Sequence, residues 1–228
     1  MKSKLIAACM ALAAFVAFAV MPAVSSASPV ITHPTGTVLA TGTKIEATNI
    51  GVTKFTSSTL NTECSTATLT GTLVKNTTTG GGFEGEISTA TFKGTGKEED
   101  CTATGTFFTG SAAATPETGT NGLPWCIKNA AAGDNFELNG GACGGLTRGI
   151  RFGLDLTGLV TCTYEKTGGL TGTFRTDLTG SEDATAKLNS GQKFTRVSGF
   201  GCPSEGELDM EFTLETDVSP ASPVYIST

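Results

Sequence analysis

Residues 121–145 read NGLPWCIKNAAAGDNFELNGGACGG and lie near the middle of the chain. They contain the only tryptophan, Trp125, and two cysteines, Cys126 and Cys143. A block rich in Thr and Gly, with alternating apolar and polar residues, lies on each side. Each block is bounded by two cysteines: Cys64 and Cys101 in the first, Cys162 and Cys202 in the second. This layout predicts two β-rich arms around a central segment that is stapled by cysteines.

The N-terminus has the layout of a secretory signal. Lys2 and Lys4 give it a positive start, an apolar run follows over Leu5–Val20, and small residues at Ser25-Ser26-Ala27 suit cleavage. We therefore expect residues 1–27 to be a signal peptide and residues 28–228 to be the exported protein. Cys9 precedes most of the apolar run, where a lipoprotein cleavage site would have no function, so it is left out of the fold.

The composition limits the partners of the exported part. Removal of the two signal lysines leaves 13 basic against 21 acidic side chains, a formal charge of −8. Such a chain has no electrostatic footprint for nucleic acid or for an anionic membrane. No later segment reaches the ~20 apolar residues of a spanning helix. The length suits one all-β domain, with a split considered near residues 111–121.

Six cysteines remain after the signal, an even number that predicts three disulfides in an exported protein. Six cysteines allow 15 pairings. The two long spacings are similar, 37 and 40 residues, and favour pairing between neighbours. The predicted pairs are Cys64–Cys101, Cys126–Cys143 and Cys162–Cys202. A zinc site is the alternative, but the chain has no C-x2-C spacing and only one histidine, His33.

Alternation of apolar and polar residues predicts strands along most of the chain. Threonine, with about 41 residues, suits a pleated surface, and 30 glycines punctuate the turns. The clearest strands are Thr66–Val74, Ile150–Leu156 and Leu208–Leu214, each with one apolar face. A slip in the alternation predicts a β-bulge near Ser88–Thr89. The predicted fold is an all-β, disulfide-stapled β-sandwich, Greek-key or jelly-roll-like, with about 12–14 short strands.

Motifs that would indicate catalysis are missing. The sequence has no G-x-S-x-G elbow, no H-E-x-x-H and no phosphate-binding glycine loop. Glu98, Glu99 and Asp100 could bind calcium, but they lack the spaced oxygens of a calcium loop. The acids on the last long strand, Glu207 to Glu215, could in principle serve glycoside hydrolysis; a solvated face is the alternative. We therefore expect no enzyme, no cofactor and no metal site.

In outline, the signal peptide, the Thr/Gly-rich strands and the paired cysteines resemble secreted actinobacterial proteins of unknown function. The layout also resembles the alkane-oxidation activator family of small exported bacterial proteins. The matching features are Cys64, Cys101, Leu123-Pro124-Trp125 and Cys143-Gly144. Cys126, directly after the tryptophan, departs from that pattern. The resemblance implies an exported, surface-associated protein that influences growth on apolar substrates, and it implies no catalytic residue.

These observations favour a non-catalytic exported protein that acts at the cell surface or in the extracellular matrix. The alternative is an extracellular glycan- or ligand-binding β-sandwich module with Trp125 as the stacking residue. The expected partner is an unidentified extracellular or cell-surface molecule.

Overall fold

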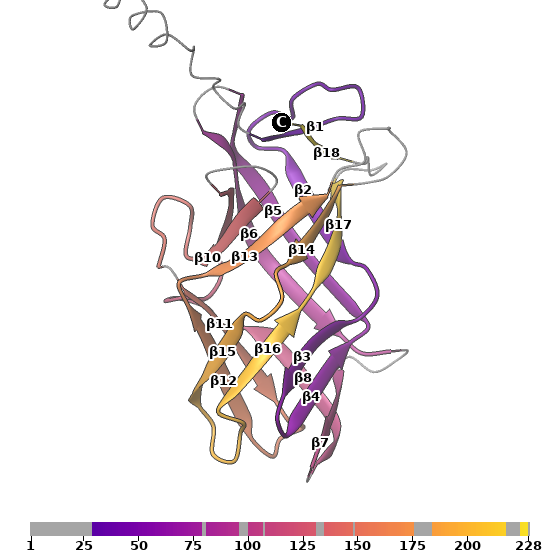
Figure 1. Ribbon diagram of the computed structural model, residues 1–228, viewed down its shortest axis with the longest axis vertical. Coiled ribbons are helices and arrows are strands. Elements are labelled where there is room, and N and C mark those ends of the chain that lie inside the picture. The colour runs from indigo at the N-terminus through magenta and orange to yellow at the C-terminus, as the bar shows by residue number, and fades with distance from the viewer. Residues whose placement is uncertain are drawn as a thin grey trace, which may run out of the picture.

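The computed structural model describes residues 29–78, 81–95, 100–106, 108–130, 135–147, 149–175, 184–217 and 224–227. Within these ranges the protein is all-β: it has eighteen strands and no helix. The expected signal peptide, residues 1–27, lies outside them. Sixteen strands form two closed barrels of eight strands each, stacked along the long axis of the molecule (Figure 1).

The two barrels are named upper and lower as they stand in Figure 1. The upper barrel comprises β2 (Lys44–Asn49), β5 (Thr66–Thr77), β6 (Gly82–Lys93), β9 (Trp125–Asn129), β10 (Asn135–Gly140), β13 (Leu170–Arg175), β14 (Thr185–Leu188) and β17 (Glu211–Thr216). The lower barrel comprises β3 (Thr53–Ser57), β4 (Leu60–Cys64), β7 (Cys101–Gly105), β8 (Thr109–Pro116), β11 (Gly149–Asp155), β12 (Thr161–Thr167), β15 (Lys193–Ser198) and β16 (Glu205–Asp209).

The chain passes between the two barrels eight times. Each passage joins one strand of each barrel, and we call such a pair a run; the eight runs are β2–β3, β4–β5, β6–β7, β8–β9, β10–β11, β12–β13, β14–β15 and β16–β17. Successive runs are antiparallel neighbours, and the last run closes on the first through β17 with β2 and β16 with β3. The molecule is therefore a meander of eight long runs, each interrupted at a waist between the barrels. The two predicted arms do not exist as separate units, because strands from all parts of the chain contribute to both barrels.

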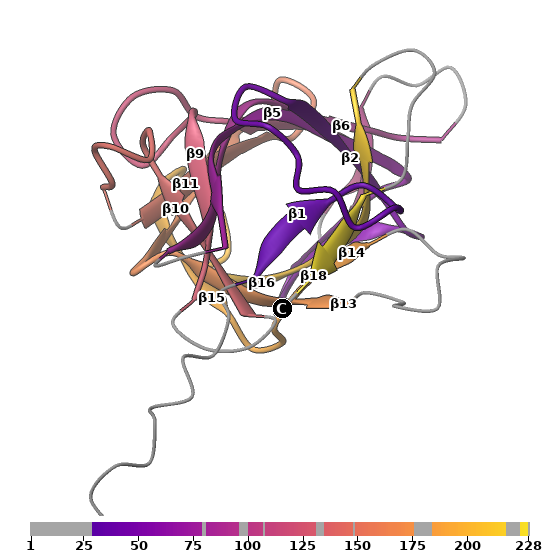
Figure 2. The same cartoon turned by 90° about the horizontal axis from the view of Figure 1, so that it is seen from above.

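A short two-stranded sheet covers the upper end of the structure. β1 (Val30–Thr32) and β18 (Tyr225–Ser227) pair antiparallel, and together we call them the terminal ribbon. Figure 2, viewed from above, shows both strands lying across the opening of the ring of barrel strands. Ile31 is buried and belongs to the same apolar core as the barrel interior.

The alternating pattern explains which side chains fill the barrels. On β5, Ala67, Leu69 and Leu73 are buried, whereas Thr66, Thr68 and Thr70 face outward. On β11 and just after it, the predicted apolar residues Ile150, Phe152, Leu154 and Leu156 are also all buried. Each strand thus contributes one apolar face to a core that runs through both barrels.

The all-β class and the three disulfides are confirmed, and the bridges join the predicted cysteine pairs. The bulge is also confirmed: Thr70 pairs with Thr89 and Gly71 with Ile87, so Ser88 is the extra residue. The sheets, however, close into barrels instead of forming a sandwich, and the strands number more than the predicted 12–14. Sequence alternation specifies one buried face for each strand, and a sandwich and a barrel satisfy that condition equally.

Residues 111–121, the region considered for a domain split, begin inside β8 and continue into the connection that leads from β8 to β9. This is one of the eight passages between the lower and the upper barrel. The bond between Leu123 and Pro124 in the same connection is a cis peptide.

Candidate functional site

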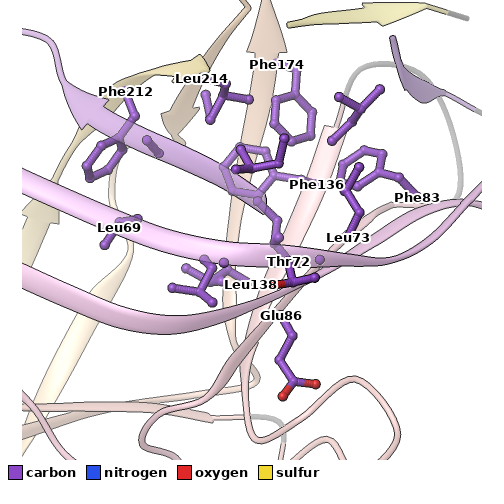
Figure 3. A pocket seen from close by; sticks show the side chains of 18 of the residues that line it. Leu69, Thr72, Leu73, Phe83, Glu86, Phe136, Leu138, Phe174, Phe212 and Leu214 are labelled. Atoms are coloured by element: carbon purple, nitrogen blue, oxygen red, sulfur yellow. The ribbon is translucent and has the colours of Figure 1, made fainter. Parts of the chain in front are cut away.

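The upper barrel encloses an apolar cavity of about 80 Å³ directly below the terminal ribbon. Four phenylalanines from four different strands contribute to its wall: Phe83, Phe136, Phe174 and Phe212. The ring centroids of Phe136 and Phe174 are 4.7 Å apart, and those of Phe83 and Phe174 are 5.3 Å apart. Figure 3 shows the aromatic and aliphatic side chains grouped around this space.

Aliphatic side chains complete the wall of the upper cavity. They come from the ribbon and from seven barrel strands, and they include Ile31, Leu69, Leu73, Ile87, Leu138, Leu188 and Leu214. Glu86 is the one ionisable residue at the wall, and Figure 3 shows its carboxylate pointing away from the rings. The interior therefore offers dispersion contacts and no charge.

A glycine on β13 makes room for one of the rings. Gly172 pairs directly with Phe136 of β10, and a Cβ at position 172 would lie 2.1 Å from the ring carbon Cζ of Phe136. Any larger residue would therefore push the Phe136 ring out of its place. On β13, Leu170 and Phe174 thus supply apolar side chains, and Gly172 between them leaves space for the ring of Phe136.

The terminal ribbon is held over the cavity by one buried amide. The backbone N–H of Ile31 donates to Oδ1 of Asn76 (3.0 Å), and Nδ2 of Asn76 donates to the carbonyls of Ile31 (2.7 Å) and Leu39 (2.9 Å). Asn76 lies near the end of β5, although its NTTTGGG context predicts a flexible turn. The amide can satisfy these groups only because the start of the chain returns to this position.

A second cavity, of about 40 Å³, lies in the core of the lower barrel and the waist. Leu138 lines both cavities, so it lies between them. The lower wall is also mostly apolar, but it includes Thr53, Thr62 and Trp125, whose exposed fractions are only 2–3%. Their polar atoms, the two Oγ1 hydroxyls and the indole Nε1, have no hydrogen-bond partner in the described part of the chain.

Trp125, the predicted stacking residue, begins β9 and pairs with Ile87 and Gly140. Its ring is 3% exposed and lines the lower cavity. A ligand could therefore contact this ring only from inside the barrel. The neighbouring Cys126 bonds to Cys143 and so fixes the start of β9 to the connection that follows β10.

The other bridges lie at the waist and near the lower end. Cys64–Cys101 joins the end of β4 to the start of β7, where both strands reach the waist. Cys162–Cys202 joins β12 to the connection between β15 and β16. All six predicted cysteines are therefore used in structural bridges.

The carboxylates considered for other chemistry do not gather at a site. Glu207, Asp209, Glu211 and Glu215 lie on the outward face of β16 and β17, and Lys187 Nζ lies 3.0 Å from Glu211 Oε2. Glu98 and Glu99 lie outside the described residues. Within the described ranges, no three His, Cys, Asp or Glu side chains are grouped so that they could hold a metal ion. His33, half-buried, follows β1 in the turn that precedes Val38.

Among the described residues, three ionisable groups have shifted pKa values, and none of these three lines the upper or the lower cavity. Burial raises the pKa of Tyr164, inside the lower barrel, to about 12. Burial also acts to raise the pKa of Glu165, but hydrogen bonds from Arg151 and Asn121 outweigh it and lower this pKa. On the surface, a hydrogen bond to Glu63 raises the pKa of Lys54. These shifts accompany structural contacts.

The described ranges contain no helix with the length and apolar character needed to cross a membrane. Comparison of the chain with protein-family models, with curated proteins and with solved structures finds no match.

Proposed function

We propose that this is a non-catalytic exported binding protein that holds a small apolar ligand in the upper barrel, beneath the terminal ribbon. This proposal narrows the ligand-binding alternative drawn from the sequence and replaces a glycan by an apolar molecule. The observation that carries it is the upper cavity itself, whose wall consists almost entirely of aliphatic and aromatic side chains.

The chemistry of the wall supports an apolar ligand. A glycan would bring hydroxyl groups that need hydrogen-bond partners, and burial without them costs several kcal/mol (about 2–7). An aliphatic or aromatic molecule has no hydrogen bonds with water to lose, and it gains contacts with the rings of Phe83, Phe136 and Phe174. The cavity of about 80 Å³ is roughly half the size of an engineered apolar cavity of about 150 Å³ that binds benzene, so the ligand must be small or must displace side chains.

The terminal ribbon offers a route by which a ligand could enter the upper cavity. It consists of two three-residue strands, whereas each strand of the upper barrel pairs with neighbours on both sides. Short elements with few hydrogen bonds open locally at lower free-energy cost than closed sheets. Opening of the ribbon would expose the apolar cavity without breaking any pair of barrel strands.

The proposal is tested with benzene as the probe and with the methyl NMR signals of Ile31, Leu73 and Ile127 as the readout. We expect saturable shifts of these signals, because all three residues line the upper cavity. Ala186→Leu should abolish the shifts by filling the cavity, and Leu188→Ala should enlarge it and strengthen binding. If neither the wild type nor Leu188→Ala gives saturable shifts, the proposed function is wrong.

A second candidate function is the structural or surface role that the sequence favours, and one observation supports it. Phe200 is 99% exposed and Leu159 is 73% exposed. They lie in the β15–β16 and β11–β12 connections at the lower end of the molecule, and Cys162–Cys202 joins the start of β12, just after the second connection, to the first. This apolar tip would suit contact with a surface in the cell envelope. Replacement of both residues by Ser should then release the protein from the cell-wall fraction of its host without unfolding it.

A further inference from the structure

Two apolar cavities lie one below the other inside the stacked barrels. The upper cavity, of about 80 Å³, is in the upper barrel, and the lower cavity, of about 40 Å³, is in the lower barrel and the waist. Of the described residues that line these cavities, only Leu138 of β10 lines both. The two spaces therefore meet at this one side chain.

The lower cavity is as apolar as the upper one. The surface that faces it is almost entirely carbon and includes the rings of Phe55 and Phe152. Thr53, Thr62 and Trp125 belong to this wall, but their polar atoms are themselves covered and do not face the space. Burial of a polar ligand group without a partner is unfavourable. Any part of a ligand that reaches the lower cavity must therefore be hydrocarbon.

The barrels restrict the shape of a ligand that reaches both cavities. The interior of an eight-stranded barrel is just wide enough for its inward side chains to fill. Rings already occupy much of this width, such as those of Phe136 and Phe174 in the upper barrel and Phe152 in the lower one. A molecule that extends from one cavity to the other must therefore lie along the axis. A chain of methylene groups is narrower than a ring or a branched frame, so it is the hydrocarbon that fits.

Leu138 can open the passage without opening the barrel. Its backbone is fixed on both sides, because Leu138 pairs with Ile127 of β9 and with Leu170 of β13. Its side chain, by contrast, can exchange between staggered rotamers. Such an exchange would join the two spaces while every pair of barrel strands stays intact.

We propose that the two cavities hold one unbranched hydrocarbon chain, which lies along the barrel axis and passes Leu138, so that its end occupies the lower cavity. This inference rests on the proposed function, because the chain also fills the upper cavity. It adds the shape of the ligand, a chain instead of a compact ring, and it assigns to Leu138 the control of the passage between the cavities.

The test compares n-hexane with cyclohexane, which has the same number of carbon atoms in a compact ring. Contact is measured by intermolecular NOEs in NMR spectra, between the protons of the probe and methyl groups of the protein. Ile31 and Ile127 report on the upper cavity, and Ile150 and Met210 report on the lower one. We expect n-hexane to give NOEs at both levels and cyclohexane to give them at the upper level alone.

A variant that fills the lower cavity tests whether binding of the chain depends on it. Ala114 lines the lower cavity, so Ala114→Leu adds side-chain volume to that wall. n-Hexane should then lose its NOEs to Ile150 and Met210 and bind about fourfold more weakly for each methylene group that is kept out. Cyclohexane should bind as tightly as to the wild type.

Ala113→Leu is the matched control. Ala113 precedes Ala114 on β8 and lines neither cavity, since successive side chains of a strand point to opposite faces. This variant should bind both probes like the wild type. If Ala114→Leu does not fold, the wild-type NOEs decide the inference by themselves.

Octanoate distinguishes the two sources of such a chain. If octanoate gives the same NOEs at both levels as n-hexane, the inference is supported and a lipid acyl chain is a ligand, with its carboxylate outside the barrels. If only n-hexane gives them, the inference is supported and the ligand is a free hydrocarbon.

Failure of the inference and failure of the proposed function give different results. If benzene and n-hexane contact the upper cavity but n-hexane gives no NOE to Ile150 or Met210, the inference is overturned and the proposed function stands. Cyclohexane NOEs at the lower level as strong as those of n-hexane overturn the chain shape. An n-hexane affinity that is unchanged in Ala114→Leu also overturns the inference. If no probe binds, both proposals are overturned.

Discussion

The side-chain amide of Asn76 forms two hydrogen bonds with the backbone of Ile31, 45 residues earlier in the chain. Ile31 N–H donates to Oδ1, and Nδ2 donates to the Ile31 carbonyl. Asn76 thus substitutes for a neighbouring strand: it satisfies both backbone groups of a residue in the terminal ribbon. This single side chain links the ribbon to the upper barrel directly above the apolar cavity.

We expect Asn76→Ala to loosen the ribbon. The change removes three hydrogen bonds and leaves the buried Ile31 N–H without its acceptor, whereas the Ile31 carbonyl keeps its bond from the Leu39 N–H (3.0 Å). We expect a cost of about 2–3 kcal/mol. Hydrogen exchange at the Ile31 amide should become at least thirtyfold faster. Asn49→Ala is the control, because Asn49 also makes three side-chain bonds, to Gly51, Ser65 and Ala67, but at the waist. Unchanged exchange at Ile31 in Asn76→Ala would show that other contacts hold the ribbon.

Glu165 should stabilise the fold at neutral pH but not in acid. Its pKa is lowered in the folded protein because hydrogen bonds from Arg151 and Asn121 outweigh the effect of burial. A lowered folded-state pKa stabilises the fold above the unfolded-state pKa, and this contribution is lost as the pH falls through the folded-state value. Glu165→Gln should therefore lower the free energy of unfolding at pH 7, and the difference from wild type should shrink toward pH 3 in urea titrations.

The matched control for Glu165 is Glu63→Gln. Glu63 also pairs with a cation, Lys54, at 2.8 Å, but the two side chains are 51% and 46% exposed. Exposed pairs contribute about 0–1 kcal/mol, so this variant should change stability little at any pH. If both variants behave alike, the partly buried position of the Arg151–Glu165 pair has no energetic importance.

Tyr164 should make the protein sensitive to alkali. Burial raises its pKa to about 12 from an ordinary value of 10.0, and its hydroxyl donates to the Pro203 carbonyl (3.2 Å). A raised folded-state pKa stabilises the fold below the unfolded-state value, and this contribution is lost between about pH 10 and pH 12. Urea unfolding over this range should show a fall in stability that is smaller in Tyr164→Phe. A fall of the same size in the variant would assign the effect to other groups.

Removal of an unpartnered hydroxyl from the core of the lower barrel should stabilise the protein. Thr53→Val or Thr62→Val replaces a buried polar atom without a partner by a methyl group, and we expect a gain of about 1 kcal/mol in the free energy of unfolding. Thr43→Val should instead cost about 1 kcal/mol, because that hydroxyl has a partner. A loss of stability in the Thr53 and Thr62 variants would show that ordered water already satisfies the hydroxyls.

Two of the disulfides should stabilise the fold to different extents, because they enclose chain segments of different length. Cys162 and Cys202 are separated by 40 residues, and Cys126 and Cys143 by 17. A chain-entropy estimate gives about 4 kcal/mol for the first bridge and about 3 kcal/mol for the second. Paired Cys→Ala variants, compared by urea unfolding, should follow this order. The reverse order would mean that contacts in the folded state outweigh the unfolded-chain effect.

Local features of the fold could be predicted from the sequence. The inward residues of β5 and β11, the bulge at Ser88 and the disulfide pairs all depend on residues that are close in the chain or on spacings within it. Barrel closure could not be predicted, because it depends on β17 meeting β2, and nothing in either strand marks the other as its partner.

The candidate site could be predicted only in part. Trp125 attracts attention as the only tryptophan, but its burial and its place in the lower cavity depend on residues from six other runs. The four rings of the upper cavity lie on β6, β10, β13 and β17, in alternating patterns that any core strand would show. The NTTTGGG context of Asn76 predicts an exposed turn. Asn76 is instead only 8% exposed, and its side chain is hydrogen-bonded to β1, near the start of the chain.

The closure of the last run on the first affects the order in which the protein can be made. Thr213 donates a hydrogen bond to the Thr48 carbonyl across 165 residues of chain (3.2 Å), and β2 has no second neighbour until β17 has been synthesised. A growing chain therefore carries an open sheet edge for almost its whole length, which invites pairing with other chains. Such distant pairing also slows folding. Cells that make this protein must therefore keep the nascent chain apart from its copies until its final segment emerges.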